Sequence, residues 1–208
     1  MAGTNDGNAA DETAGDVTLQ SYESAAEQYV AESQEPRGRV LDFLDAFARL
    51  VGSGTVLELG SGPGWDADHV ERRGLRVVRT DGAASLVTRL REQGHDAWML
   101  DVRTDDFGGP YDGLLANAVL LHLSRDELVE VLRRARRALR PGGVLAFTLK
   151  EGDSEAWSHA KLDLPRHFTY WRESGVRRVL SATGWQVLSL ERVRGRREDW
   201  LYVLVRPG

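Results

Sequence analysis

A glycine-rich segment in the first third of the chain carries the residues with the clearest potential for chemistry. It reads Glu58-Leu59-Gly60-Ser61-Gly62-Pro63-Gly64 and follows an apolar run that begins at Thr55. Glycine permits a tight turn from a strand into a helix and lets the backbone approach a ligand without an intervening Cβ atom. Glu58 adds a negative charge beside this turn, which suits a ligand with an amino group better than one with phosphates. The segment therefore predicts a loop that holds a small ligand against its backbone.

Two residues disfavour a dinucleotide at this loop. The dinucleotide pattern G-x-G-x-x-G, counted from Gly60, requires a small residue where Trp65 stands. Pro63 also lacks the amide that could contact a phosphate. An NAD-dependent oxidoreductase is therefore a disfavoured alternative.

Three polar residues, Asp81, Asp101 and Asn117, each stand at the end of a later predicted strand. In a doubly wound sheet, the carboxyl ends of parallel strands share one edge, and ligands bind there at the topological switch point. We therefore expect these three side chains to lie beside the glycine loop.

The elements that must position these residues follow from hydrophobic patterning. From residue 52 onward, short apolar runs alternate with helical patterns, which is typical of a mostly parallel sheet with helices on both faces. The predicted strands are Thr55–Leu59, Leu75–Thr80, Asp96–Leu100, Tyr111–Asn117, Gly143–Leu149, Trp185–Glu191 and Trp200–Val205, and the last two form an antiparallel hairpin at one edge. The predicted helices are 18–32, 39–51, 66–73, 84–93, 124–139 and 172–183, and residues 151–167 form an irregular polar loop.

Composition limits the domain organisation and the chemistry. The 208 residues include no cysteine, which excludes disulfides, thiolate metal sites and a cysteine nucleophile. Residues 1–16 are predicted to be a disordered acidic tail, residues 17–51 an N-terminal helical lid and residues 52–208 a single ligand-binding domain. No apolar run is long enough to span a bilayer and no signal peptide is seen, so we expect a cytoplasmic protein without a membrane partner. The N-terminal segment is acidic and the rest of the chain has a net charge near zero, which argues against a nucleic-acid partner.

The pattern Glu58-x-Gly60-x-Gly62-x-Gly64 resembles motif I of class I S-adenosylmethionine (SAM) dependent methyltransferases. Asp81, Asp101 and Asn117, at the ends of the next three strands, occur where that family has its further motifs. The resemblance covers about residues 18 to 206. It implies SAM as the cofactor. It also implies a single-domain Rossmann-like α/β fold, whose seven-stranded, mostly parallel sheet has an antiparallel edge strand.

The resemblance further implies which residues bind the cofactor. Gly60 and Gly62 would pack under the methionine part and the ribose, Asp81 would accept hydrogen bonds from the ribose hydroxyls, and Asp101 would accept one from the adenine amine. As alternatives, the two aspartates would serve in turns or helix caps. The implied cofactor-binding residues are Glu58, Gly60, Ser61, Gly62, Gly64, Asp81, Gly82, Asp101, Val102 and Asn117.

Two histidines are candidate catalytic residues. His122 lies just past the fourth strand, where this family brings substrates to the methyl group, and a neutral imidazole there can take a proton from a nucleophile. His167 follows the predicted polar loop. For both, packing against the sheet is an open alternative. The candidate substrate-binding residues are Tyr22 and Tyr29 on the N-terminal helix, together with Trp157, Arg166 and His167.

Methyl transfer is an in-line displacement that demands positioning more than catalytic groups, so the acceptor is hard to infer. An acceptor on cytosine C5 is excluded because it needs a cysteine nucleophile. The residues after Asn117 also lack the paired prolines that are usual in enzymes methylating exocyclic amines of nucleic acids. We expect O- or N-methylation of a small molecule by a monomer or homodimer without a metal site, and an acidic acceptor would pair with Arg166 or Arg172. An RNA or protein methyltransferase and a noncatalytic SAM-binding subunit remain alternatives.

Overall fold

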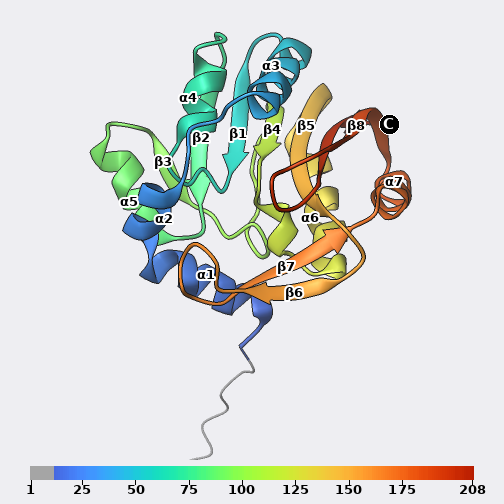
Figure 1. Ribbon diagram of the computed structural model, residues 1–208. Helices are drawn as coiled ribbons and strands as arrows, with labels where there is room; N and C mark the ends of the chain where they lie inside the picture. The colour runs from blue at the N-terminus through green and yellow to red at the C-terminus, as the bar shows by residue number, and fades with distance from the viewer. Residues whose placement is uncertain (1–11) are drawn as a thin grey trace, which may run out of the picture.

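Five parallel strands form the centre of one sheet in the computed structural model, which describes residues 12–208 (Figure 1). They are β1 (Thr55–Leu59), β2 (Arg76–Asp81), β3 (Ala97–Met99), β4 (Tyr111–Ala116) and β5 (Leu139–Glu151). Their spatial order is β3-β2-β1-β4-β5. Because the chain moves outward from β1 to β3 and then returns to the other side of β1 with β4, the topological switch point lies between β1 and β4.

A C-terminal hairpin completes this sheet. The strands β8 (Trp185–Val193) and β9 (Trp200–Pro207) pair antiparallel with each other, and β9 pairs antiparallel with β5. All seven predicted strands and the edge hairpin are thus confirmed. One detail differs: the antiparallel strand is β9, which lies second from the edge, while the edge strand β8 runs in the same direction as β5.

Two further strands replace part of the predicted irregular loop. Strands β6 (Glu155–Ser158) and β7 (Arg166–Trp171) form an antiparallel hairpin, and β7 also pairs in parallel with the last two residues of β5. The prediction of a loop over residues 151–167 was wrong in part: residues 152–154 and 159–165 are irregular, but Arg166 and His167, whose polarity favoured a loop, begin β7. Both residues are buried in the folded chain, so tertiary contacts rather than hydropathy define this strand.

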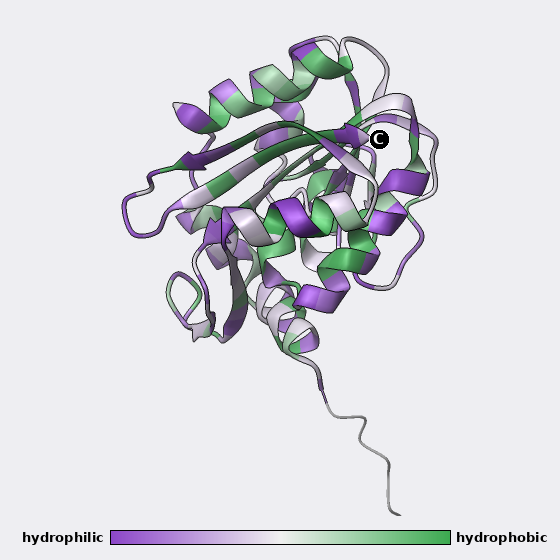
Figure 2. Ribbon diagram, turned by 90° about the vertical axis from the view of Figure 1, so that its right-hand side faces the viewer, coloured by the Kyte–Doolittle hydropathy of each residue, from purple (hydrophilic) through white to green (hydrophobic). Residues whose placement is uncertain are grey.

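Helices cover both faces of the sheet because apolar residues on its strands point alternately to each side. Leu57 and Leu59 share a core cluster with α6 and α7, whereas Val56 packs with α3 and α4. The helices along the sheet are α3 (Arg39–Val51), α4 (Trp65–Glu71), α5 (Ala84–Glu92), α6 (Arg125–Ala138) and α7 (Glu173–Ala182). Helix α3, which was predicted as part of the N-terminal lid, packs on the sheet itself. Figure 2 shows apolar residues along the central strands and a mixture of polar and apolar residues along the helices. Within residues 12–208, no helix has the length and apolar character needed to cross a bilayer.

The N-terminal segment forms two helices, α1 (Ala14–Ser24) and α2 (Ala26–Glu32), where one helix was predicted. Thr13 caps α1 through a reciprocal capping box with Asp16, so ordered structure begins before the predicted start at residue 17. The rest of the predicted acidic tail, residues 1–11, lies outside the described residues. Figure 1 places α1 beside the β6–β7 hairpin, beyond the carboxyl ends of the central strands.

The packing of α3 on the sheet generates a stability prediction. Phe47 is fully buried between α3 and the sheet, so Phe47→Ala should lower the free energy of unfolding by about 3 to 5 kcal/mol. Leu50 lies on the same helix but is 42% exposed, so Leu50→Ala should cost much less. Urea unfolding of both variants checks the expectation, and equal losses would contradict this placement of α3.

Candidate active site

A cavity opens at the carboxyl edge of the sheet, between the glycine loop and the N-terminal helices. Six of the ten predicted cofactor-binding residues line it: Gly60, Gly62, Asp81, Gly82, Asp101 and Val102. Ser61 and Asn117 line an adjoining cavity that also contacts Gly60. The structure therefore brings the strand-end residues together as the sequence predicted.

The glycine loop requires its glycines for reasons of geometry. Gly60 and Gly62 have φ values of 66° and 52°, in the left-handed region that favours glycine. A Cβ atom on Gly60 would lie 2.5 Å from a methyl group of Val119, and one on Gly62 would lie 3.2 Å from the Tyr29 ring. The loop backbone is thus in close contact with the chain segments above it.

Asp81 at the end of β2 is buried and holds two turns together. Its Oδ2 accepts a hydrogen bond from the Gly62 amide at 2.9 Å, and its Oδ1 accepts one from the Ala83 amide at 2.9 Å. Burial raises the pKa of this carboxyl, while these amides oppose the rise. Since each carboxylate oxygen can accept more than one hydrogen bond, Asp81 retains capacity for hydroxyl donors in the cavity.

Two more acids lie close to the loop, Glu58, which is buried, and Asp66, which is half-buried. Glu58 is 3% exposed, and burial, with a contribution from the charge of Asp66, raises its pKa to about 8. Its Oε2 has no hydrogen-bond partner among the described residues. Asp66 accepts a hydrogen bond of 2.7 Å from the amide of Asn117, whose oxygen accepts one from Thr148 at 2.9 Å. Asp66 was not among the predicted site residues, although its place in the first turn of the helix after the glycine loop could have indicated it.

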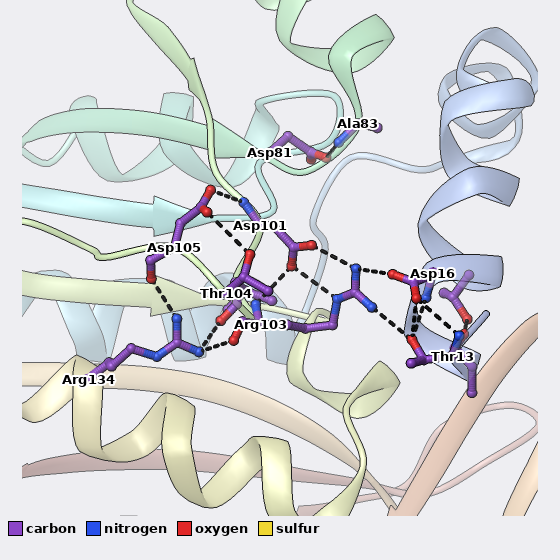
Figure 3. A network of polar contacts seen from close by, with 12 residues as sticks. Thr13, Asp16, Asp81, Ala83, Asp101, Arg103, Thr104, Asp105 and Arg134 are labelled. Carbon is purple, nitrogen blue, oxygen red and sulfur yellow. Dashed lines mark hydrogen bonds and ion pairs between the residues drawn. The ribbon is translucent and has the colours of Figure 1, made fainter. Parts of the chain in front are cut away.

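The expected adenine-binding residue Asp101 has an unexpected partner (Figure 3). Arg103 donates to both of its oxygens, at 3.1 and 2.7 Å. Burial raises the pKa of Asp101, but the bonds and charge of Arg103 outweigh burial and leave that pKa below its ordinary value. Arg103 also donates to Thr13 Oγ1 at 3.2 Å and forms an ion pair of 2.8 Å with Asp16. This network ties the start of α1 to the edge of the cavity, and no pattern in the sequence predicts it.

Tyr22 and His122 form a hydrogen-bonded pair in the cavity wall. The Nδ1 of His122 is 2.7 Å from the His167 carbonyl oxygen, which can only accept, so Nδ1 carries the proton. Its Nε2 therefore accepts from the Tyr22 hydroxyl at 3.0 Å, and that hydroxyl in turn accepts from Arg166 at 3.1 Å. Burial lowers the pKa of His122 to about 3, with smaller effects from nearby cations, so the imidazole is neutral at neutral pH. Tyr29 packs edge-on against Tyr22 at 5.0 Å between ring centroids.

The structure does not bring every predicted substrate residue to this cavity. The His167 side chain lies against Trp157, with 5.2 Å between ring centroids, and pairs with Glu155 at 3.5 Å. Trp157 itself is 48% exposed. Arg172, the other arginine considered for an acidic acceptor, pairs with Glu151 and Asp153 on the surface. Of the predicted substrate and catalytic residues, Tyr22, Tyr29 and His122 line the cavity, and Arg166 contacts Tyr22 from behind it.

Comparison with known proteins gives the family. The profile of a family described as a methyltransferase domain matches residues 27–190. The N-demethylindolmycin N-methyltransferase of Streptomyces griseus is 28% identical over 203 residues, which cover 92% of this chain and 85% of that protein. A carboxy-S-adenosyl-L-methionine synthase of Pseudomonas fluorescens is 32% identical over 120 residues, which cover 51% of this chain and 47% of that protein.

Solved structures support the same fold. The DhpI–SAH complex superposes with a TM-score of 0.71 at 23% identity, covering 93% of this chain and 97% of that chain. The [4+2]-cyclase SpnF superposes with a TM-score of 0.72 at 18% identity, covering 94% of this chain and 96% of that chain. The fold and the glycine-loop site together define a class I methyltransferase. The chain belongs to the methyltransferase-domain family, and its cofactor is SAM.

Glu58→Gln tests the burial of the acid beneath the loop. Because the folded-state pKa of Glu58 is raised to about 8, the folded state keeps a proton that the unfolded state loses near pH 4.5, and stability is lost as the pH rises between these values. The variant should therefore gain stability relative to wild type from about pH 5 to about pH 8, by up to about 1.4 kcal/mol per pH unit. Urea unfolding across this range, with the exposed Glu92→Gln as control, measures the gain. A difference independent of pH would contradict a buried ionisable group.

Arg103→Met tests the link between α1 and the cavity edge. The variant keeps an aliphatic side chain but loses its bonds to Asp101, Asp16 and Thr13, so amide exchange in α1 should accelerate by about 10- to 100-fold. Exchange in α3 should stay unchanged. The control is Arg133→Met, because Arg133 pairs on the surface with Glu130. Unchanged exchange in α1 would show that Arg103 does not hold this helix.

Proposed function

We propose that this protein transfers the methyl group of SAM to a nitrogen or oxygen atom of a small molecule. The observation that carries the proposal is the cavity itself, which the glycine loop and Asp81 line together with Tyr22 and His122. The relative from Streptomyces griseus supports a small acceptor, because its name describes N-methylation of N-demethylindolmycin.

The residues at the sheet edge fit SAM by their chemistry. Asp81 offers carboxylate oxygens to the ribose hydroxyls, and the backbone of Gly60 and Gly62 leaves room for close approach. Asn117 is oriented by Asp66 and Thr148 and would meet the methionine amino group. Bound here, SAM supplies an electrophilic methyl group on a positively charged sulfur. The buried carboxylates of Asp81 and Asp66 favour such a cation in this part of the site.

Asp101 would bind the adenine amine together with Arg103 rather than alone. Its two oxygens are already engaged by Arg103, so an adenine amine would share the carboxylate with the guanidinium. The amide of Val102, which also lines the cavity, would meet a ring nitrogen. Adenine and the start of α1 would then be recognised by one connected network.

On the acceptor side, the chain orients the nucleophile and excludes water. The Tyr22 hydroxyl donates to His122 and accepts from Arg166, which leaves one lone pair to accept a hydrogen bond from an acceptor N–H or O–H. His122 would hold Tyr22 in place, because burial disfavours the imidazolium that a general base must become. His167 would contribute its carbonyl oxygen to this arrangement. Positioning at about 3 to 3.5 Å is the main requirement of an in-line displacement.

Calorimetric titration with SAM, S-adenosylhomocysteine, NAD and NADP tests the cofactor site. Asp81→Asn should weaken binding of both adenosyl compounds by about 100-fold or more, because it removes the charge and one strong acceptor for the ribose. The exposed Asp96→Asn should bind like wild type. Binding of NAD in place of the adenosyl compounds would contradict the proposal.

Transfer of labelled methyl groups into fractions of a cell extract tests the acceptor class. Label should enter the low-mass fraction, and its appearance in protein or RNA would contradict a small acceptor. For an acceptor found in this way, Tyr22→Phe should lower kcat by about 10-fold or more through loss of the orienting hydroxyl. Its affinity for S-adenosylhomocysteine should stay within about twofold of wild type, since the hydroxyl bonds to His122 and Arg166. A loss confined to cofactor affinity would assign Tyr22 to the cofactor side.

A further inference from the structure

A second cavity adjoins the first one at the glycine loop. Gly60, Tyr29 and Ala118 line both cavities, so the two spaces meet around the Tyr29 ring. The second cavity is also lined by polar residues of the sheet edge, α4, the segment after α2 and the loop between β6 and β7. They are Ser61, Asn117, Asp66, Ser33, Gln34, Glu35, Arg37 and Lys161. A ligand that crosses the glycine loop can therefore place one half in each cavity.

Lys161 is the cation that reaches this second cavity from the β6–β7 loop. Its Nζ donates to Ser33 Oγ at 2.7 Å and lies 4.1 Å from the centroid of the Tyr29 ring. Its backbone has a φ of 78°, an uncommon conformation for a residue with a side chain. The loop is further fixed by a hydrogen bond of 2.9 Å from Gln28 to the Lys161 carbonyl oxygen. Lys161 is thus held against the N-terminal helices by contacts of both its side chain and its backbone.

The charge of Lys161 has no carboxylate partner within 4 Å in residues 12–208. Burial lowers its pKa to about 8, the charge of Arg166 adds to the effect, and the charge of Glu32 opposes it in part. A partly buried ammonium that lacks a counter-ion is destabilised, and a ligand carboxylate beside it would offset that cost. Asp66, a carboxylate that also lines this cavity, is bound by the Asn117 amide.

We propose that Lys161 binds the α-carboxylate of the methionine half of SAM. The inference rests on the proposed function, in which Asp81 holds the ribose in the first cavity. From there, the amino-acid half of the cofactor extends past Gly60 into the second cavity. Asp66 and Asn117 suit its ammonium group, and Lys161 supplies the opposite charge for its carboxylate.

Calorimetry with two ligands isolates this contact from every other one. S-adenosylhomocysteine carries the carboxylate, whereas its decarboxylated analogue, 5′-deoxy-5′-(3-aminopropylthio)adenosine, lacks only that group. Lys161→Met should weaken the binding of S-adenosylhomocysteine by about 10- to 100-fold, as expected for loss of a charge-assisted hydrogen bond. It should change the affinity for the analogue by less than about threefold. Lys161→Arg should retain most of the affinity for S-adenosylhomocysteine, since it keeps the charge.

Arg39→Met serves as the control, because Arg39 is exposed and pairs with Asp42 and Glu191. Thermal unfolding followed by circular dichroism establishes that each variant is folded. If Lys161→Met lowered the affinity for both ligands equally, the inference would be overturned, and Lys161 would be a residue that only holds the N-terminal helices in place. Unchanged affinity for S-adenosylhomocysteine would overturn it as well. If the wild type bound neither ligand, the proposed function itself would fail, which is a distinct result.

Discussion

The buried carboxyl groups beside the glycine loop, with the negative charge of Asp66 and Asp81 among them, are the constraint on which the rest of the site depends. Glu58, Asp66 and Asp81 converge where β1, β2 and α4 meet, and burial raises the pKa of each carboxyl. The loop amides and the Asn117 amide compensate part of this charge. A cofactor with a sulfonium and an ammonium group compensates more of it, so the same burial that costs stability favours a cationic ligand.

The N-terminal helices are held over this charged edge by contacts along their length. The Thr18 hydroxyl accepts from the His167 amide at 2.9 Å, and the Ser21 hydroxyl donates to the Pro165 carbonyl oxygen at 2.7 Å. Together with the bond between Arg166 and Tyr22, these contacts join α1 to β7. The lid and the β6–β7 hairpin consequently behave as one wall of the cavity, although they are far apart in sequence.

The sequence was sufficient for the parts of the fold that local patterns specify. Apolar periodicity located the seven main strands, and the glycine loop with Asp81, Asp101 and Asn117 located the sheet edge at which the two cavities lie. It was insufficient where tertiary contacts decide. Strand β7 was missed because its Arg166 and His167 are polar yet buried, and the partner of Asp101 was missed because Arg103 acts across the gap to α1. Lys161 could not be anticipated, since only the folded β6–β7 loop brings it near the glycine loop.

The direction of β9 has a practical consequence for work with this enzyme. Because β9 runs antiparallel to β5, its last residues pair near the amino end of that strand, with Val205 opposite Leu145. Gly208 is anchored there by a hydrogen bond of 2.9 Å to Gly184. The C-terminus therefore lies at the end of the sheet opposite the cavity, whereas α1 lies at the cavity edge (Figure 1). A tether or fluorescent label at Gly208 therefore leaves the ligand entrance free. A label attached at Thr13 would lie next to that entrance.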